Sequence, residues 1–292
     1  MSELLLSTNG LTKQYGHHKA VDKVNLHIKK GAIYGFIGRN GAGKTTCLKM
    51  ISGLARPTAG EIEMFGCKGK ELERIRSRVG CLIEAPGLYG NMNAYTNLKI
   101  KCEWFGIRKK GYIEDILETV GLEGVGKKKT KHFSLGMKQR LGIGLALVGE
   151  PDLLVLDEPI NGLDPQGIAE VRDTIQRLRD ERNMTILISS HILEELSKIA
   201  TDYGIIHNGS LLQELTSEEL MKRCSERIEI ELIHPEQAVP ILDRMGFTNY
   251  QVTDKEHIHI FERLNESAAL NMELAKSGIP VKGISITSEE LE

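Results

Sequence analysis

Short, almost wholly apolar segments alternate with amphipathic ones over the first 215 residues. The apolar segments at 32–37, 153–156 and 185–189 lack the alternation of half-exposed strands, so they predict strands buried on both faces of a sheet. Apolar residues at helical spacing separate them, and the expected helices span 44–54, 113–120, 136–148, 167–182 and 192–200. Strands that alternate with helices predict an α/β fold with a parallel, doubly wound sheet.

The pattern changes after Thr216. Residues 228–233 (IEIELI) alternate between apolar and acidic side chains, as in a strand with one buried face. Further strands are expected at 249–253, 257–261 and 281–287, and helices at 236–245 and 266–277. The order strand, helix, strand, strand, helix, strand predicts a small α+β domain of the ferredoxin-like type.

The charge changes at the same point. Residues 216–292 carry eight basic and fifteen acidic side chains, a net charge of −7, whereas the rest of the chain has a net charge of +5. We therefore expect a larger domain at 1–215 and an accessory domain at 216–292, which suits a chain of 292 residues. The acidic domain is not expected to bind nucleic acid or anionic lipid, and we expect it to regulate or to bind a partner.

Composition excludes several classes of protein. A net charge of −2 with 40% hydrophobic residues fits neither a basic nucleic-acid-binding tail nor a disordered chain. The longest apolar run, residues 141–149, is much shorter than the roughly 20 residues of a membrane-spanning helix. The N-terminus lacks the order of a secretory signal, and five cysteines without a CxxC pair predict a reduced environment without a cysteine-built metal site.

The segment GRNGAGKT, from Gly38 to Thr45, follows a predicted buried strand and precedes a predicted helix. Its glycines allow the backbone N–H groups to curl around phosphate oxygens, and the helix N-terminus attracts the same anion. Lys44 would supply a positive charge to the β- and γ-phosphates, and the Thr45 hydroxyl would face Mg²⁺. This spacing, in this context, predicts a nucleotide-phosphate loop.

Two further segments are ambiguous when each is considered alone. LLVLDEP ends a buried strand in Asp157 and Glu158, which could hold Mg²⁺ through water and activate an attacking water, or could simply be a solvated strand end. FSLGMKQR places Ser134 and Gly136 at the start of a predicted helix. There the serine could bind an anion, although an N-cap is the more common role.

Taken together, these motifs resemble those of the ATP-binding subunits of ABC transporters. GRNGAGKT is similar to Walker A, LLVLDEP to Walker B with its catalytic glutamate, and FSLGMKQR to the family signature. Asp164 in NGLD matches the D-loop, His191 matches the switch histidine, and Tyr15 lies where the family stacks an aromatic ring on adenine. The resemblance covers roughly residues 5–215 and implies a P-loop NTPase with a helical subdomain at about 85–150.

The resemblance also implies a set of site residues. It assigns catalysis to Glu158 and His191, with ATP and Mg²⁺ as cofactors. Mg²⁺ would be held by Thr45, Asp157 and Glu84. The nucleotide would be bound by Tyr15, Gly38, Arg39, Asn40, Gly41, Ala42, Gly43, Lys44, Thr45, Thr46, Glu84, Ser134, Gly136, Asp157 and Asp164.

The sequence departs from the family pattern at two places. Leu135 and Met137 replace a glycine and a glutamine of the signature, while Ser134 and the second glycine are kept. Glu84, in CLIEAPGLY, stands where the family has the glutamine of the Q-loop. A glutamate followed by APG, together with SLGMKQRLGI, is similar to the subgroup that confers bacitracin resistance or lantibiotic immunity.

The resemblance implies an exporter ATPase that works at the cytoplasmic side of the cell membrane, bound there through separate transmembrane permease subunits. Two copies would enclose ATP head to tail, with Ser134 and Gly136 facing the phosphate loop of the partner. An exporter of another substrate, such as a lipid, ion or drug, stays open. A soluble ABC protein acting on ribosomes or DNA is disfavoured, because the chain has one ATP domain and only 89 positions from Thr45 to Ser134. Glu158 and His191 argue against a regulator without turnover.

Three other residues have simpler interpretations. Trp104 is expected to pack inside the helical subdomain. His257 and His259 lie two apart on one strand, where a solvated face is favoured over a metal pair because no third ligand is evident.

Overall fold

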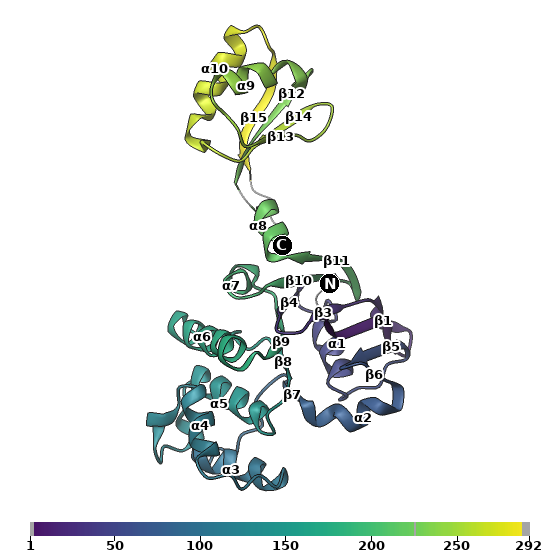
Figure 1. Cartoon of the computed structure of the whole chain (residues 1–292), viewed down its shortest axis with the longest axis vertical. Helices are drawn as coiled ribbons and strands as arrows, with labels where there is room; N and C mark the ends of the chain where they lie inside the picture. Colours follow the sequence, from purple (N-terminus) through teal and green to yellow (C-terminus); the bar gives the residue numbers. More distant parts are fainter. Residues whose placement is uncertain (1–2, 225, 288–292) are drawn as a thin grey trace. The chain divides into compact units, whose positions relative to one another are not determined.

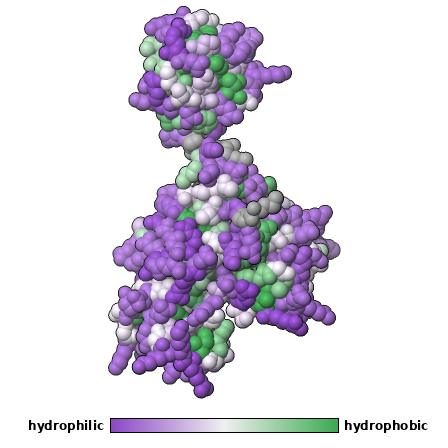
Figure 2. All heavy atoms as spheres, in the orientation of Figure 1, coloured by the Kyte–Doolittle hydropathy of each residue, from purple (hydrophilic) through white to green (hydrophobic). Residues whose placement is uncertain are grey.

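The computed structural model describes residues 3–224 and 226–287, and these divide into two compact units, 1–217 and 218–292 (Figure 1). We describe each unit by itself. Hydrophilic side chains cover most of the visible face of both units, broken by smaller hydrophobic patches (Figure 2). Among the described residues, no helix has both the length and the apolar character that crossing a membrane requires.

The first unit is built on a six-stranded sheet. β4 (Ile33–Ile37), β8 (Leu153–Asp157) and β9 (Thr185–Ser190) are buried along their whole length, as expected of strands covered on both faces. The sheet order is β11-β10-β4-β9-β8-β7. The outer strands are β7 (Val79–Leu82), β10 (Asp202–His207) and β11 (Ser210–Thr216), of which only β11 runs antiparallel. The predicted parallel α/β core is confirmed.

A second, antiparallel sheet in the first unit was not predicted. It has the order β2-β1-β5-β6, and a short strand, β3, also pairs with β1. Its strands are β1 (Leu4–Tyr15), β2 (His18–Val24), β3 (His27–Lys29), β5 (Ala59–Met64) and β6 (Cys67–Lys68). One hydrophobic core joins this sheet to the central one through helix α1 (Lys44–Ile51), of which Cys47, Leu48 and Met50 are wholly buried. This packing fixes the helix that follows the phosphate loop.

The helical subdomain lies on the other side of the central sheet from β1 and β5 (Figure 1). It contains α3 (Ala94–Trp104), α4 (Tyr112–Thr119) and α5 (Leu135–Leu147), of which α3 was not predicted. The other helices of the unit are α2 (Leu72–Ile75), α6 (Pro165–Arg182) and α7 (Leu193–Ser197). Short 3₁₀ segments occur at Gly69–Glu71, Arg76–Arg78, Glu123–Val125 and Thr130–His132.

The second unit has the predicted ferredoxin-like order. Helix α8 (Ser217–Cys224) precedes an antiparallel sheet of order β13-β14-β12-β15. Its elements are β12 (Arg227–Leu232), α9 (Val239–Arg244), β13 (Tyr250–Val252), β14 (His257–Ile260), α10 (Ser267–Lys276) and β15 (Val281–Thr287), with 3₁₀ segments at Pro235–Gln237 and Leu264–Glu266. Ile228, Ile230 and Leu232 face a core that includes Leu242 of α9 and Leu270 of α10. The alternation in β12 therefore marks its buried face correctly.

Candidate nucleotide site

The phosphate loop connects β4 to α1, as the sequence predicts. Gly43 is the N-cap of α1 with φ 105°, and a Cβ at this position would overlap the carbonyl oxygen of Ala20. Only glycine therefore allows the loop to turn into the helix here. Arg39, Asn40 and Gly41 of the loop are exposed beside the N-terminus of α1, and a helix N-terminus attracts anions.

Lys44 folds back over this loop. Its side chain is only 5% exposed, and its ammonium donates hydrogen bonds to the carbonyl oxygens of Gly38 and, at 3.2 Å, Arg39. The same Nζ lies 3.1 Å from Oε1 of Glu158. The contact is an ion pair and not a hydrogen bond. Oε1 of Glu158 is buried and has no hydrogen-bond partner among the described residues. Lys44 is thus held beside the carboxylate at the end of β8.

Hydroxyl groups surround the second carboxylate, Asp157. Thr45 Oγ1 donates to Asp157 Oδ2 at 2.8 Å, and Ser189 Oγ donates to Oδ1 at 2.6 Å. Asp157 is buried at the end of β8, between the phosphate-loop helix and β9. Hydroxyl and carboxylate oxygens are the ligands that Mg²⁺ prefers, so the donor set at Thr45 and Asp157 fits this ion.

Glu158 is aimed by its backbone and by His191. It adopts φ 48°, a left-handed conformation that is uncommon for a non-glycine residue, and such strain clusters at functional sites. Its N–H donates to Ser189 Oγ at 2.9 Å. The ring Nδ1 of His191, just beyond β9, lies 2.8 Å from Glu158 Oε2. The structure thus brings together the predicted pair Glu158 and His191.

Glu84 makes its closest described contact with a lysine, Lys49, rather than with Thr45 or Asp157. Its Oε1 lies 2.5 Å from the Nζ of Lys49 on α1. The hydrogen bond that Lys49 donates to Glu84 raises the pKa of Lys49, and the charges of Glu84, Tyr15 and Asp157 act in the same direction. Tyr15 itself is 53% exposed at the end of β1, and the Lys13 ammonium lies over its ring, 5.0 Å from the ring centroid. Lys49 is a site residue that the sequence did not single out.

Ser134 and Asp164 are both helix N-caps. Ser134 accepts a hydrogen bond from the Met137 N–H at 3.2 Å at the start of α5, and Asp164 accepts one from the Gly167 N–H at 3.2 Å at the start of α6. Gly136 is buried, and a Cβ there would lie 3.4 Å from Gly167 Cα. None of the hydrogen bonds described for these residues reaches the phosphate loop of the same chain.

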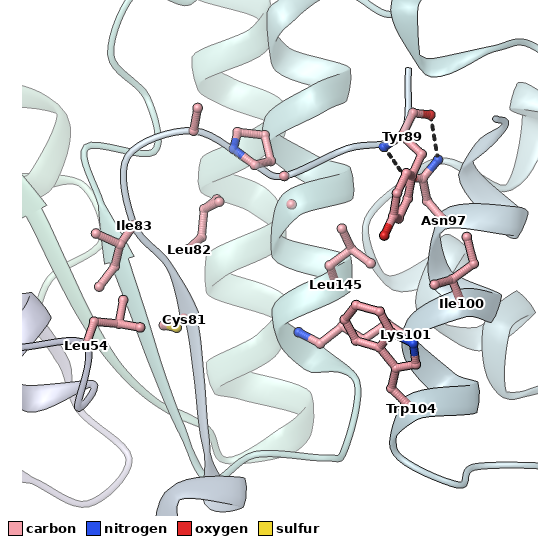
Figure 3. A pocket seen from close by; sticks show the side chains of 14 residues that line it. Leu54, Cys81, Leu82, Ile83, Tyr89, Asn97, Ile100, Lys101, Trp104 and Leu145 are labelled. Atoms are coloured by element: carbon pink, nitrogen blue, oxygen red, sulfur yellow. Dashed lines mark hydrogen bonds between the residues drawn. The ribbon is translucent and has the colours of Figure 1, made fainter. Parts of the chain in front are cut away.

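An apolar groove of about 370 Å³ lies between the loop that carries Glu84 and the helices α3 and α5 (Figure 3). Hydrogen bonds of 2.8 and 3.3 Å between Tyr89 and Asn97 fasten the loop to α3. On α5, a Cβ at Gly142 would lie 2.7 Å from Pro86 Cβ, so glycine permits the close approach of the loop. Residues from four separate segments of the chain line the groove, and the sequence did not predict it.

Trp104 corrects one prediction. Its side chain is 77% exposed and lines the groove, so it is not packed inside the helical subdomain. It is the last residue of α3, where the chain leaves the helix bundle. The neighbouring Lys101 also lines the groove, and burial lowers the pKa of its ammonium.

The two histidines of β14 lie on the face of the sheet opposite the core. His257 Nδ1 lies 3.0 Å from Asp254 Oδ1, and this hydrogen bond raises the pKa of His257. His259 Nε2 lies 3.7 Å from Glu229 Oε1, and burial lowers its pKa. In the described part of the chain, no group of three or more His, Cys, Asp or Glu residues could hold a metal ion.

The fold and the site define a P-loop ATPase. The ABC transporter family profile matches residues 21–161. The chain is 45% identical to the bacitracin transport ATP-binding protein BcrA of Bacillus licheniformis, over 99% of this chain and 95% of that protein. It is 44% identical to the lantibiotic transport ATP-binding protein SrtF of Streptococcus pyogenes, over 72% and 90% of the two chains.

Solved structures show the same fold. The ADP conformation of an ATP-binding cassette of an ABC transporter matches with a TM-score of 0.68 and 24% identity, covering 76% of this chain and 95% of that one. A dimeric post-hydrolysis cassette bound to ADP and phosphate matches with a TM-score of 0.65 and 24% identity, covering 73% and 98%. The chain belongs to the ATP-binding subunits of ABC transporters.

Proposed function

We propose that the chain is the ATP-hydrolysing subunit of an exporter for peptide antibiotics of the bacitracin or lantibiotic type, giving resistance or immunity. The observation that carries the ATPase is the Lys44–Glu158–His191 contact chain beside the Thr45–Asp157 pair. The choice of substrate is supported by 45% identity to the bacitracin transport protein, which extends through the second unit. Glu84 in IEAPG supports the same subgroup.

The geometry suggests how the site acts on ATP. Bound phosphates would compete with Glu158 for the ammonium of Lys44, because both are anions within its reach. Thr45 and Asp157 would hold Mg²⁺, which neutralises charge on the β- and γ-phosphates. Glu158, released from Lys44 and kept in orientation by His191, would then accept a proton from the attacking water.

A second copy of the chain would complete the site. Ser134 caps the N-terminus of α5, a helix of 13 residues, and such an N-terminus attracts anions. The hydrogen bond described for Ser134 does not reach the phosphate loop of its own chain. We propose that Ser134 and Gly136 of the partner copy contact the γ-phosphate, with Asp164 near the interface. A related cassette bound to ADP and phosphate is dimeric, which supports the pairing of two copies.

Permease subunits would bind at the groove between the Glu84 loop, α3 and α5. Its exposed aromatic side chains, Tyr89 and Trp104, suit an apolar helix of a membrane partner. The subunit would then lie at the cytoplasmic side of the cell membrane, held there by separate permeases. We propose no nucleic-acid partner, because the net charge is −2.

The test is Glu158→Gln, with Glu181→Gln as a matched control on the exposed end of α6. Without the general base, turnover should fall by about 10²- to 10⁴-fold while ATP binding persists. An ATP-bound dimer should accumulate in size-exclusion chromatography. Growth of a susceptible bacterium that carries the permeases, in bacitracin or a lantibiotic, reports transport.

The two readouts separate the parts of the proposal. Full turnover in Glu158→Gln would overturn the catalytic assignment. A wild-type chain that hydrolyses ATP but protects against neither peptide class would leave the ATPase in place and point to another substrate, such as a lipid, ion or drug.

A further inference from the structure

We propose that Lys49 is a positioning residue that holds Glu84 one helical turn away from the Thr45–Asp157 metal site, and that Glu84 must leave Lys49 to join this site. The inference rests on the proposed function, since it assumes that Mg²⁺ is held at Thr45 and Asp157. It concerns a residue of α1 that no nucleotide-binding motif contains.

The spacing on α1 sets the geometry. Thr45 and Lys49 are four residues apart in one helix, so their side chains lie on the same face. Thr45 Oγ1 donates to Asp157 at 2.8 Å, and Lys49 Nζ lies 2.5 Å from Glu84 Oε1. One turn of helix, about 5.4 Å along the axis, therefore separates the backbone positions of Thr45 and Lys49.

The sheet brings Glu84 to the same edge as the catalytic carboxylates. Leu82 of β7 and Leu156 of β8 are paired in parallel register, and Glu84 and Glu158 each follow their leucine by two residues. Glu84 has φ 62° and Glu158 has φ 48°, so both carboxylates leave their strands through a left-handed residue. Glu84 is thus within the same cluster of strand ends as Asp157, yet its side chain points to Lys49.

Lys49 and Mg²⁺ would compete for Glu84 because the Glu84 side chain is charged, whereas a glutamine in its place would be neutral. An ionised carboxylate attracts both an ammonium and a divalent cation, whereas a neutral amide binds each of them weakly. The Glu84 side chain is 65% exposed and that of Lys49 is 33% exposed, so the ion pair is partly solvated. Such a pair is weak enough to exchange partners, and salt screens it.

The experiment measures binding of Mn²⁺, as a probe for Mg²⁺, by electron paramagnetic resonance in the presence of a non-hydrolysable ATP analogue. Four full-length variants are compared with the wild type: Lys49→Met, Lys49→Arg, Glu84→Gln and the double variant Lys49→Met with Glu84→Gln. We expect Lys49→Met to tighten Mn²⁺ binding by about two- to fivefold, the usual worth of an exposed ion pair. Lys49→Arg keeps the pair and should bind Mn²⁺ as the wild type does.

The Glu84→Gln background isolates the contact. There, Lys49→Met should leave Mn²⁺ affinity unchanged, because the pair is already broken. An equal change in both backgrounds would mean that Lys49 acts on the site directly, and weaker Mn²⁺ binding in Lys49→Met would also overturn the inference. A salt series on the wild type and Glu84→Gln gives the same comparison without changing Lys49, since only the wild type has the pair to screen. If the wild type bound no Mn²⁺ with nucleotide, the proposed function itself would fail.

Discussion

Two lysine–glutamate ion pairs lie at the nucleotide site, one buried and without a hydrogen bond, the other partly exposed and hydrogen-bonded. Each joins a lysine of α1 to a glutamate just beyond a strand of the central sheet: Lys44 to Glu158 and Lys49 to Glu84. The backbones of both glutamates adopt the left-handed conformation. This conformation costs about 1–3 kcal/mol and is kept only where the surrounding structure fixes it. Two carboxylates of the site are therefore paired with lysines of α1, whereas Asp157 accepts hydrogen bonds from hydroxyl groups.

Lys44→Ala tests the first pair. Removing the ammonium takes away a charged contact to phosphate, and such contacts are worth about 1.5–3 kcal/mol, so ATP affinity should fall by roughly 10- to 100-fold. It also leaves Glu158 Oε1 buried without its counter-ion. Titration with a fluorescent ATP analogue measures the affinity, and steady-state phosphate release measures turnover, which should be lost. Lys70→Ala, at an exposed position of the first unit, is the control. Wild-type affinity in Lys44→Ala would contradict the role of Lys44.

At the scale of elements, the sequence predicts best where a strand or helix is strongly patterned. The buried runs at 153–156 and 185–189 became β8 and β9 almost residue for residue. The antiparallel sheet was missed because its strands are partly polar and its pairing is non-local: β1 is bulged and pairs with β5 some fifty residues later. In α3, buried Asn97 and exposed Trp104 reverse the usual pattern, so no apolar stripe revealed the helix or the groove.

The residues of the candidate site likewise divide into those that the sequence predicts and those that it does not. Contiguous motifs identified Lys44, Asp157 and Glu158, because the phosphate loop and the strand end each lie within one short segment. Lys49 was not predicted, because its role depends on a contact with Glu84, 35 residues away in the chain. Ser134 is an N-cap in the single chain, and the contact with phosphate that we propose for it would be made to a second copy.

The loop that carries Glu84 connects the nucleotide site to the groove, so Glu84→Ala tests coupling between them. We expect this variant to lose more resistance than ATP hydrolysis, because Thr45, Asp157 and Glu158 stay in place while the charged contact of the loop is lost. ATPase activity of the purified chain and antibiotic resistance of cells that carry the permeases are measured for the same variant. Glu71→Ala, at an exposed site outside the groove, is the control. Full resistance with lost hydrolysis would contradict this coupling role.

At the scale of the whole molecule, the second unit is separate in core, sheet and charge. Among the described residues, its hydrophobic cluster is drawn from residues 228–284, and its sheet consists of β13, β14, β12 and β15. SrtF matches 72% of this chain over 90% of its own length, whereas BcrA matches 99%. SrtF, a related transport ATP-binding protein, is thus matched over most of its own length without a segment as long as the second unit. We propose that the second unit regulates or binds a partner and takes no direct part in hydrolysis.

Truncation after Ser217 tests this division of labour. The cut leaves β11 complete, and it keeps the hydrogen bond of 2.9 Å from the Ser217 N–H to the Thr201 carbonyl oxygen. ATP affinity of the truncated chain should therefore stay within about twofold of the wild type, since Lys44, Asp157 and Glu158 all lie in the first unit. Resistance, or assembly with the permeases, should weaken.

In the full chain, Ile230→Asp buries an unpaired charge in the second core and should reproduce the loss. A truncated chain that is folded by circular dichroism but no longer binds ATP would show that the second unit takes part in forming the nucleotide site.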